Sequence, residues 1–93
     1  MDYLKVYNLT KDDIIEIQNS ISDTDYSELS MHEERVHQII KFLKSKNVKN
    51  IKELLINKTS LFYENLDYIK SIFEKYDSKM IESINEDVNN LIY

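Results

Sequence analysis

Two histidines lie close together in the segment His32-Glu33-Glu34-Arg35-Val36-His37. The zinc-binding motif of metalloproteases places two histidines four residues apart on one helix. Both imidazoles then face one metal, and a glutamate between them activates water. Here the spacing is five residues, which turns the two side chains about 140° apart around a helix, and no third ligand suggests itself. Glu33 and His37 are four residues apart and are expected to pair weakly on the surface. The segment therefore predicts a solvated cluster at a helix start and no metal site.

Carboxylate pairs occur at three places: Asp12/Asp13, Glu33/Glu34 and Glu86/Asp87. Neighbours on a helix point about 100° apart, so none of these pairs is a natural acid–base dyad, although a dyad built from distant residues stays open. Cysteine and glycine are both absent. Their absence excludes thiol chemistry, disulfides and the glycine-dependent loops that bind phosphates or expose a nucleophilic serine. We therefore predict a non-enzymatic protein with no catalytic, cofactor-binding or metal-binding residue.

Positive charge gathers in the middle of a chain whose formal net charge is -5. Residues 35–58 contain seven basic residues and a single acid, Glu53. The possible nucleic-acid contacts are Arg35, Lys41, Lys44, Lys46, Lys49, Lys52 and Lys58. Lysines provide salt-dependent contacts to phosphates without reading the base sequence. The alternative is that these charges belong to solvated helix faces.

Tyrosine is abundant, with seven copies in 93 residues. It is enriched at protein interfaces because it combines a large apolar ring with a polar tip. The possible protein-interface residues are Tyr26, Tyr63, Tyr68 and Tyr93. The acidic N-terminal block around Tyr26 is suited to a basic partner and, in the extreme, to imitation of a phosphate backbone. The alternative is that the tyrosines only close the rim of a small core.

Hydrophobic spacing predicts an all-α fold of four or five short helices in one small domain covering residues 1–93. The expected helix starts are Thr10, Ser30 (with Glu33 as a capping box), Asn50 (with Glu53), Thr59 or Ser60, and Ser78. Residues 22–29 lack periodicity and indicate a loop or a short turn of helix, and Tyr3 to Leu9 is ambiguous. Asn47 is expected to adopt the left-handed conformation that glycine usually provides at a helix end.

An internal repeat relates residues 42–63 to residues 72–93 at a period of 30 residues without a gap. Leu54 then matches Ile84, and Leu61 matches Leu91. A looser copy begins at Tyr3. Periods in this range are typical of stacked helical units that bury their faces against their neighbours. We therefore expect two to three stacked units, the alternative being the self-similarity that any amphipathic helical chain shows.

Two segments carry a resemblance to a known family: Phe42-Leu43-Lys44-Ser45-Lys46-Asn47-Val48-Lys49-Asn50-Ile51-Lys52-Glu53-Leu54-Leu55 and Tyr7-Asn8-Leu9-Thr10-Lys11-Asp12-Asp13-Ile14-Ile15-Glu16-Ile17. They resemble the repeats of the mitochondrial transcription termination factor family. Asn8, Asn47 and Asp77 stand where those repeats have a turn glycine, and the position of the proline that leads the third helix falls near Thr59. The resemblance implies a curved all-helical solenoid that binds nucleic acid along a basic groove.

The chain has no apolar run like that of a signal peptide and no stretch of about 18 apolar residues that could span a bilayer. We therefore expect a soluble, cytoplasmic protein with no membrane partner. The size and acidity favour a small regulator or inhibitor, of the kind that a phage or mobile element encodes, which acts by stoichiometric binding to another protein or to itself. The alternative is a nucleic-acid-binding helical-repeat protein that uses residues 35–58.

Overall fold

The computed structural model describes residues 1–92, and Tyr93 lies outside the described residues. The six α-helices are α1 (Lys11–Ser20), α2 (Asp23–Met31), α3 (Glu33–Ser45), α4 (Ile51–Asn57), α5 (Leu66–Phe73) and α6 (Ser78–Glu86). Three 3₁₀ helices accompany them, namely η1 (Asp2–Tyr7), η2 (Thr59–Tyr63) and η3 (Val88–Asn90). No strand occurs in residues 1–92. The predicted all-α class is confirmed, whereas the number of helices exceeds the four or five expected.

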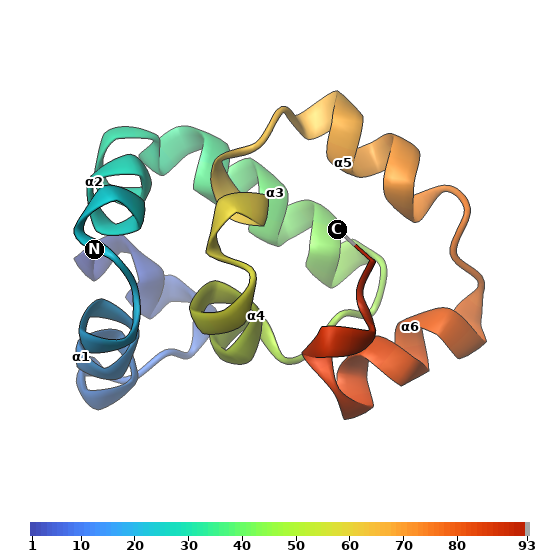
Figure 1. The fold of residues 1–93 in the computed structure, drawn as a ribbon, viewed down its shortest axis with the longest axis horizontal. Coiled ribbons are helices and arrows are strands. Elements are labelled where there is room, and N and C mark those ends of the chain that lie inside the picture. Colours follow the sequence, from blue (N-terminus) through green and yellow to red (C-terminus); the bar gives the residue numbers. More distant parts are fainter. Residues whose placement is uncertain (93) are drawn as a thin grey trace.

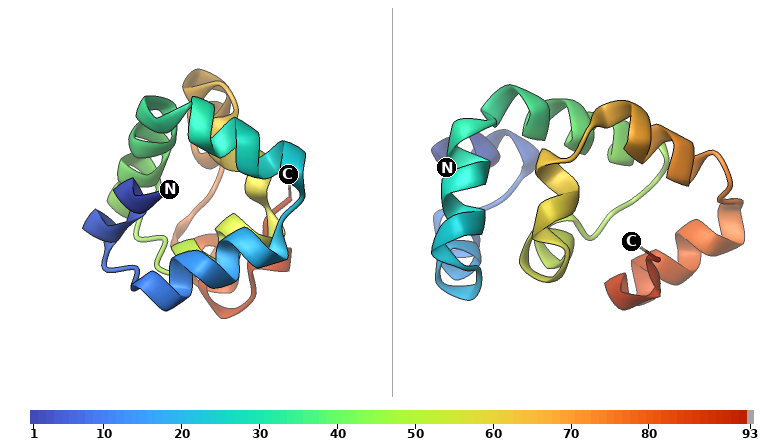
Figure 2. Two further views of the ribbon diagram at one scale, coloured as in Figure 1. Left: turned by 90° about the vertical axis from the view of Figure 1, so that its left-hand side faces the viewer. Right: turned by 45° about the horizontal axis from the view of Figure 1, so that its top comes forward.

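Helix α3 runs through the middle of the molecule, and η2, α2 and α5 pack against it (Figure 1). The segment η1–α1 lies at one end of the longest axis, where α1 contacts both η1 and α4. The α6–η3 segment lies toward the other end, and η3 reaches back to α4. In the right-hand view of Figure 2, α3 and α5 follow one another along one side while α4 lies between the two ends. Helices α3 and α4 are therefore the frame to which both ends attach.

One cluster of buried apolar side chains holds these elements together, and every helix contributes to it. The largest fully buried members are Phe62 and Phe73. The Phe73 ring meets Phe42 edge-on, with 6.0 Å between the ring centroids, which is a favoured geometry for aromatic pairs. The i, i+3, i+4, i+7 spacing of apolar residues on α3 predicts one buried stripe, and all four members are fully buried: Val36, Ile39, Ile40 and Leu43. The spacing on α6 predicts that Met80, Ile81 and Ile84 point inward. Ile81 and Ile84 are buried, but Met80 is 39% exposed.

The predicted Thr10 cap and the predicted left-handed Asn47 are both confirmed. Thr10 and Asp13 form a reciprocal capping box at the start of α1. Asn47 adopts the expected left-handed conformation with φ of 67°, and Asn8 does the same with φ of 62°. Asp77 differs, because its backbone is extended and its carboxylate accepts from the Met80 amide as the N-cap of α6.

Residues 22–29, predicted as a loop or a short turn of helix, form the N-cap and most of helix α2, which continues to Met31. Ser22 caps this helix by accepting from the Asp25 amide, and acidic residues occupy its first turn, where the helix dipole favours them. Apolar periodicity is missing because Leu29 is the one buried residue of α2. The predicted Ser30–Glu33 capping box is wrong, since Ser30 lies inside α2 and α3 begins after His32 with no side-chain cap.

The remaining boundaries also shift where side chains find other partners. Asn50 precedes α4 as predicted, but its amide donates to the Ile84 carbonyl and makes no cap bond. The spacing of apolar residues from Phe62 to Tyr76 predicts one helix that starts at Thr59 or Ser60. The structure divides it into η2 and α5, because the Asn65 side chain accepts from two backbone amides and caps the start of α5. The ambiguous Tyr3 to Leu9 segment forms η1 up to Tyr7. The stacking of repeat units stays a prediction.

Candidate functional site

The basic side chains of residues 35–58 have different surroundings in the structure. Lys52 of α4 forms ion pairs with two carboxylates of α1. Its Nζ lies 2.5 Å from Glu16 Oε2 and 3.2 Å from Asp13 Oδ1. Hydrogen bonds to Glu16 and then to Asp13 raise the pKa of the Lys52 ammonium. This lysine joins two helices, so its charge is largely balanced within the protein.

The other six basic residues are distributed over several elements. Lys41 and Lys44 are exposed on α3, and Lys58 is half-buried at the C-terminal cap of α4. Lys46 and Lys49 line one open hollow beside α6, which Glu82 also lines. Lys46 additionally lies 5.8 Å from the centroid of the Phe42 ring.

Of the three predicted interface tyrosines within residues 1–92, two are exposed. Tyr26 on α2 is 39% exposed and Tyr68 on α5 is 52% exposed. Tyr63 is half-buried, and its hydroxyl donates to Asp25 Oδ1 at 2.7 Å, which joins η2 to α2. The Tyr63 carbonyl also accepts from Arg35 Nη1 at 3.3 Å. Tyr93 lies outside the described residues.

A cluster that the sequence interpretation missed joins η1 to α3. The Tyr7 hydroxyl is hydrogen-bonded to His37 Nδ1, and the Tyr3 and Tyr7 rings lie 5.1 and 5.5 Å from the His37 ring. The Tyr3 hydroxyl donates to the Leu29 carbonyl at 2.8 Å. Burial raises the pKa of Tyr3, with the nearby Glu33 carboxylate and Tyr7 adding to the effect.

Only part of this cluster left a signal in the sequence. The Glu33–His37 pair was predicted from its spacing of four residues, and its atoms lie 3.7 Å apart. Tyr3 and Tyr7 share the same spacing of four residues within the ambiguous segment. That spacing does not say which distant side chain they meet.

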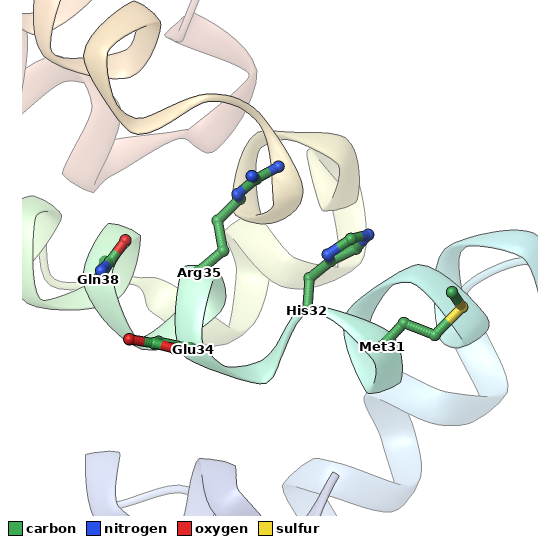
Figure 3. A pocket seen from close by; sticks show the side chains of 5 residues that line it. All are labelled: Met31, His32, Glu34, Arg35 and Gln38. Atoms are coloured by element: carbon green, nitrogen blue, oxygen red, sulfur yellow. The ribbon is translucent and has the colours of Figure 1, made fainter.

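The solvent side of α3 carries two adjoining open hollows. The first is lined by Met31, His32, Glu34, Arg35 and Gln38, and Figure 3 shows these side chains along the end of α2 and the first part of α3. The second is lined by Val6, Tyr7, Glu34, His37, Gln38 and Lys41. Glu34 and Gln38 line both hollows, so the two form one continuous surface. We call it the α3 outer face.

The α3 outer face mixes apolar, amide and charged groups. Val6 and Met31, which line different hollows, are 71% and 72% exposed. His32 lies 3.1 Å from the Glu28 carboxylate of α2, which positions its ring beside the first hollow. A surface of this composition is suited to contacts with another macromolecule, because it offers apolar contact area between hydrogen-bonding and charged groups.

Within residues 1–92, no group of three or more histidine, aspartate or glutamate side chains is arranged to hold a metal ion. None of the helices in this part of the chain combines the length and apolar character needed to cross a bilayer.

Comparisons of the chain with protein-family models, with curated proteins and with solved structures found no match. The resemblance to mitochondrial transcription termination factor repeats therefore stays a prediction.

Proposed function

We propose that this chain is a small non-enzymatic regulatory protein that acts by stoichiometric binding to another protein through the α3 outer face. The observation that carries the proposal is the pair of adjoining hollows, each with one strongly exposed apolar side chain, Val6 or Met31. Single exposed apolar residues are ordinary on protein surfaces. Here they border a continuous hollowed surface on which a partner could cover both.

Burial of these two side chains against a partner would provide a useful part of a binding free energy. Fully burying an aliphatic side chain contributes about 1.5–3 kcal/mol. Methionine adapts to irregular partner surfaces because its side chain is flexible and polarisable. Arg35 and Gln38 lie on the same face and provide hydrogen bonds for orientation, as side chains near the rim of protein interfaces do.

The distribution of charge supports a protein partner over a nucleic acid. Lys52 is paired with two carboxylates, and acidic Glu82 shares the hollow of Lys46 and Lys49. The basic middle of the sequence is therefore interrupted by acids in space. Binding to phosphates needs several lysines whose positive charge is not already compensated.

The proposal is tested with immobilised wild-type protein and two charge-matched variants. Val6→Glu combined with Met31→Glu places carboxylates in both hollows. Ile15→Glu combined with Ile92→Glu, at positions that are 42% and 80% exposed and line neither hollow, is the control. A partner retained by wild type and the control is expected to bind the double variant at least tenfold more weakly. Equal retention by the double variant, or equal loss in the control, contradicts the proposal.

The same preparations test the alternatives. Sedimentation of the wild type over a concentration series tests whether the partner is a second copy of the chain. Fluorescence anisotropy with labelled duplex DNA and single-stranded RNA over a salt series tests nucleic-acid binding. Micromolar binding that falls steeply with salt and is lost in Lys41→Glu with Lys44→Glu would replace the proposed function with the nucleic-acid one.

A further inference from the structure

Three side chains beside the second hollow form a connected polar series. The Tyr7 hydroxyl is hydrogen-bonded to His37 Nδ1, and His37 Nε2 lies 3.7 Å from Glu33 Oε1. When the hydroxyl donates to Nδ1, the imidazole proton is on Nε2 and faces the carboxylate. A hydroxyl, a base and a group that orients the base, in this order, constitute the arrangement by which proteins activate a nucleophile.

The reacting end of this series is open to small molecules. Tyr7 and His37 are half-buried and line the second hollow, together with apolar Val6 and the donors Gln38 and Lys41. The hollow therefore offers an apolar wall for an acyl group. The positive charge of Lys41 lies on the same hollow, where it favours negative charge that develops on a carbonyl oxygen.

We infer that Tyr7 is a nucleophilic acceptor site that takes one acyl group per chain from an activated acyl donor, with His37 as the general base. The Tyr7 oxygen attacks the carbonyl carbon and forms an aryl ester, while the bond from that carbon to the leaving group breaks. The phenolic proton passes to His37 Nδ1, and from the imidazolium to the leaving group or to water. Glu33 stabilises the imidazolium that exists between these transfers.

Assistance by the base is essential to the inference, because burial raises the pKa of Tyr7. The free phenolate is therefore scarcer at Tyr7 than at an exposed tyrosine. A base that removes the phenolic proton as the new bond forms makes prior formation of the phenolate unnecessary. Such assistance typically contributes about 10²–10⁴-fold in rate. Tyr3 is not an equivalent acceptor, since its hydroxyl donates to the Leu29 carbonyl.

The full chain contains its own control tyrosines for the test. The protein is treated with N-acetylimidazole at pH 7.5, and acetylation of each tyrosine is followed over time by peptide mass spectrometry. Tyr7 is expected to react at least about tenfold faster than Tyr26 and Tyr68, although both of these are more exposed. If accessibility alone decides the rate, Tyr7 reacts more slowly than both, and the inference is overturned.

The pH dependence of the wild-type rate separates the two chemistries without any substitution. The groups around His37 are Tyr3, Tyr7 and Glu33, with Glu34 and Lys41 on the same hollow. Base-assisted acetylation uses the hydrogen-bonded hydroxyl and not the free phenolate, so the rate at Tyr7 is expected to rise much less than tenfold between pH 8 and 9. A tenfold rise per pH unit in that range, as phenolate attack requires, contradicts the inference.

Two variants then test the named roles. His37→Gln should reduce Tyr7 acetylation to the rate of Tyr26, and Glu33→Gln should reduce it by a smaller factor. Tyr3→Phe removes a hydroxyl from the same cluster and should leave the rate within twofold of wild type. Circular dichroism verifies that each variant is folded, and an unchanged rate in folded His37→Gln overturns the role of His37.

Discussion

The two ends of the molecule attach to its middle by different chemistry. At the N-terminal end the attachments involve groups that titrate. Tyr7 is bonded to His37 of α3, while Lys52 of α4 pairs with Asp13 and Glu16 of α1. Proton binding and salt act directly on groups of this kind.

At the C-terminal end the attachments are neutral amides. Asn85 Nδ2 donates to the Asn47 carbonyl, and Asn85 Oδ1 accepts from the Lys49 amide, each at 2.9 Å. Asn50 Nδ2 donates to the Ile84 carbonyl, also at 2.9 Å. These bonds join the α3–α4 turn to the end of α6, and none of them carries a charge that pH can remove.

The difference between the two kinds of attachment implies that pH and salt weaken the N-terminal attachments more than the C-terminal ones. A shared apolar core connects the two ends, so they are expected to unfold together. Changes of pH and salt should nevertheless act first on the N-terminal attachments, one of which, the Tyr7–His37 bond, lies on the α3 outer face. The predictions that follow test this division, beginning with the largest expected effect.

Replacement of Phe62 tests whether the two ends share one cooperative core. Phe62 is fully buried in η2, which packs against α2, α3 and α4. Phe62→Ala is expected to lower the free energy of unfolding by about 3–5 kcal/mol, measured by urea denaturation. Far-UV circular dichroism and tyrosine fluorescence should report one coincident transition. Separate transitions for the two probes would show that the ends unfold independently.

Asn85→Ala tests the neutral attachment directly. It leaves the Asn47 carbonyl and the Lys49 amide without their bonds to this side chain, and we expect a loss of about 1–3 kcal/mol. Because the bonds are neutral, the difference from wild type should be the same in 0.1 and 1 M NaCl. Exposed Asn89→Ala is the matched control and is expected to change stability by at most about 0.5 kcal/mol. A salt-dependent difference for Asn85→Ala would contradict the division.

The two left-handed residues, Asn8 and Asn47, test whether the backbone turns contribute equally to stability while the side-chain attachments of the two ends differ. Asn8 and Asn47 both have positive φ, one before α1 and the other after α3. An alanine in this conformation costs roughly 1–2 kcal/mol, whereas glycine adopts it without strain. Asn8→Ala and Asn47→Ala should therefore lower the melting temperature by similar amounts, with the glycine variants near wild type. If only one position responds, the two turns are not equivalent.

Asp13→Asn is expected to have a small effect, which is visible as a pH dependence of stability. The Thr10 backbone amide, and then Lys52, lower the pKa of the folded Asp13 carboxyl. A lowered pKa stabilises the fold above the ordinary value of about 3.9 and loses that contribution as pH falls through the folded pKa. Urea denaturation between pH 2 and 7 should show a shallower acid loss in Asp13→Asn than in wild type. Identical slopes would contradict a role for this carboxylate.

Lys52→Met is expected to change the pH dependence of stability at high pH, as Asp13→Asn does at low pH. The raised pKa of Lys52 means that its contribution is present below the ordinary value of about 10.4 and is lost as pH rises through the folded pKa. Denaturation between pH 9 and 12 should therefore show a shallower alkaline loss in Lys52→Met. Lys44→Met, an exposed lysine on α3, is the control and should follow the wild-type curve.

Much of the fold could be read from the sequence wherever neighbours in the chain decide the outcome. The buried stripe of α3, the Thr10 cap of α1 and the left-handed Asn47 depend on residues within a few positions of one another. Helix α2 was missed because it buries one apolar residue and so lacks the period that marks a helix. The pairing of Glu33 with His37 was accessible for the same local reason.

The candidate site depends on contacts between residues far apart in the chain, so the sequence indicated some of its residues but not which distant residues they meet. Composition and spacing alone determined that the protein is all-α and lacks thiol and glycine-loop chemistry. Only the tertiary structure decided that Tyr7 meets His37 thirty positions away, or that Lys52 pairs with α1 while Lys41 stays exposed. The physical reason is that helical periodicity determines which side of a helix is apolar, whereas the packing of the whole core decides which helix that side meets.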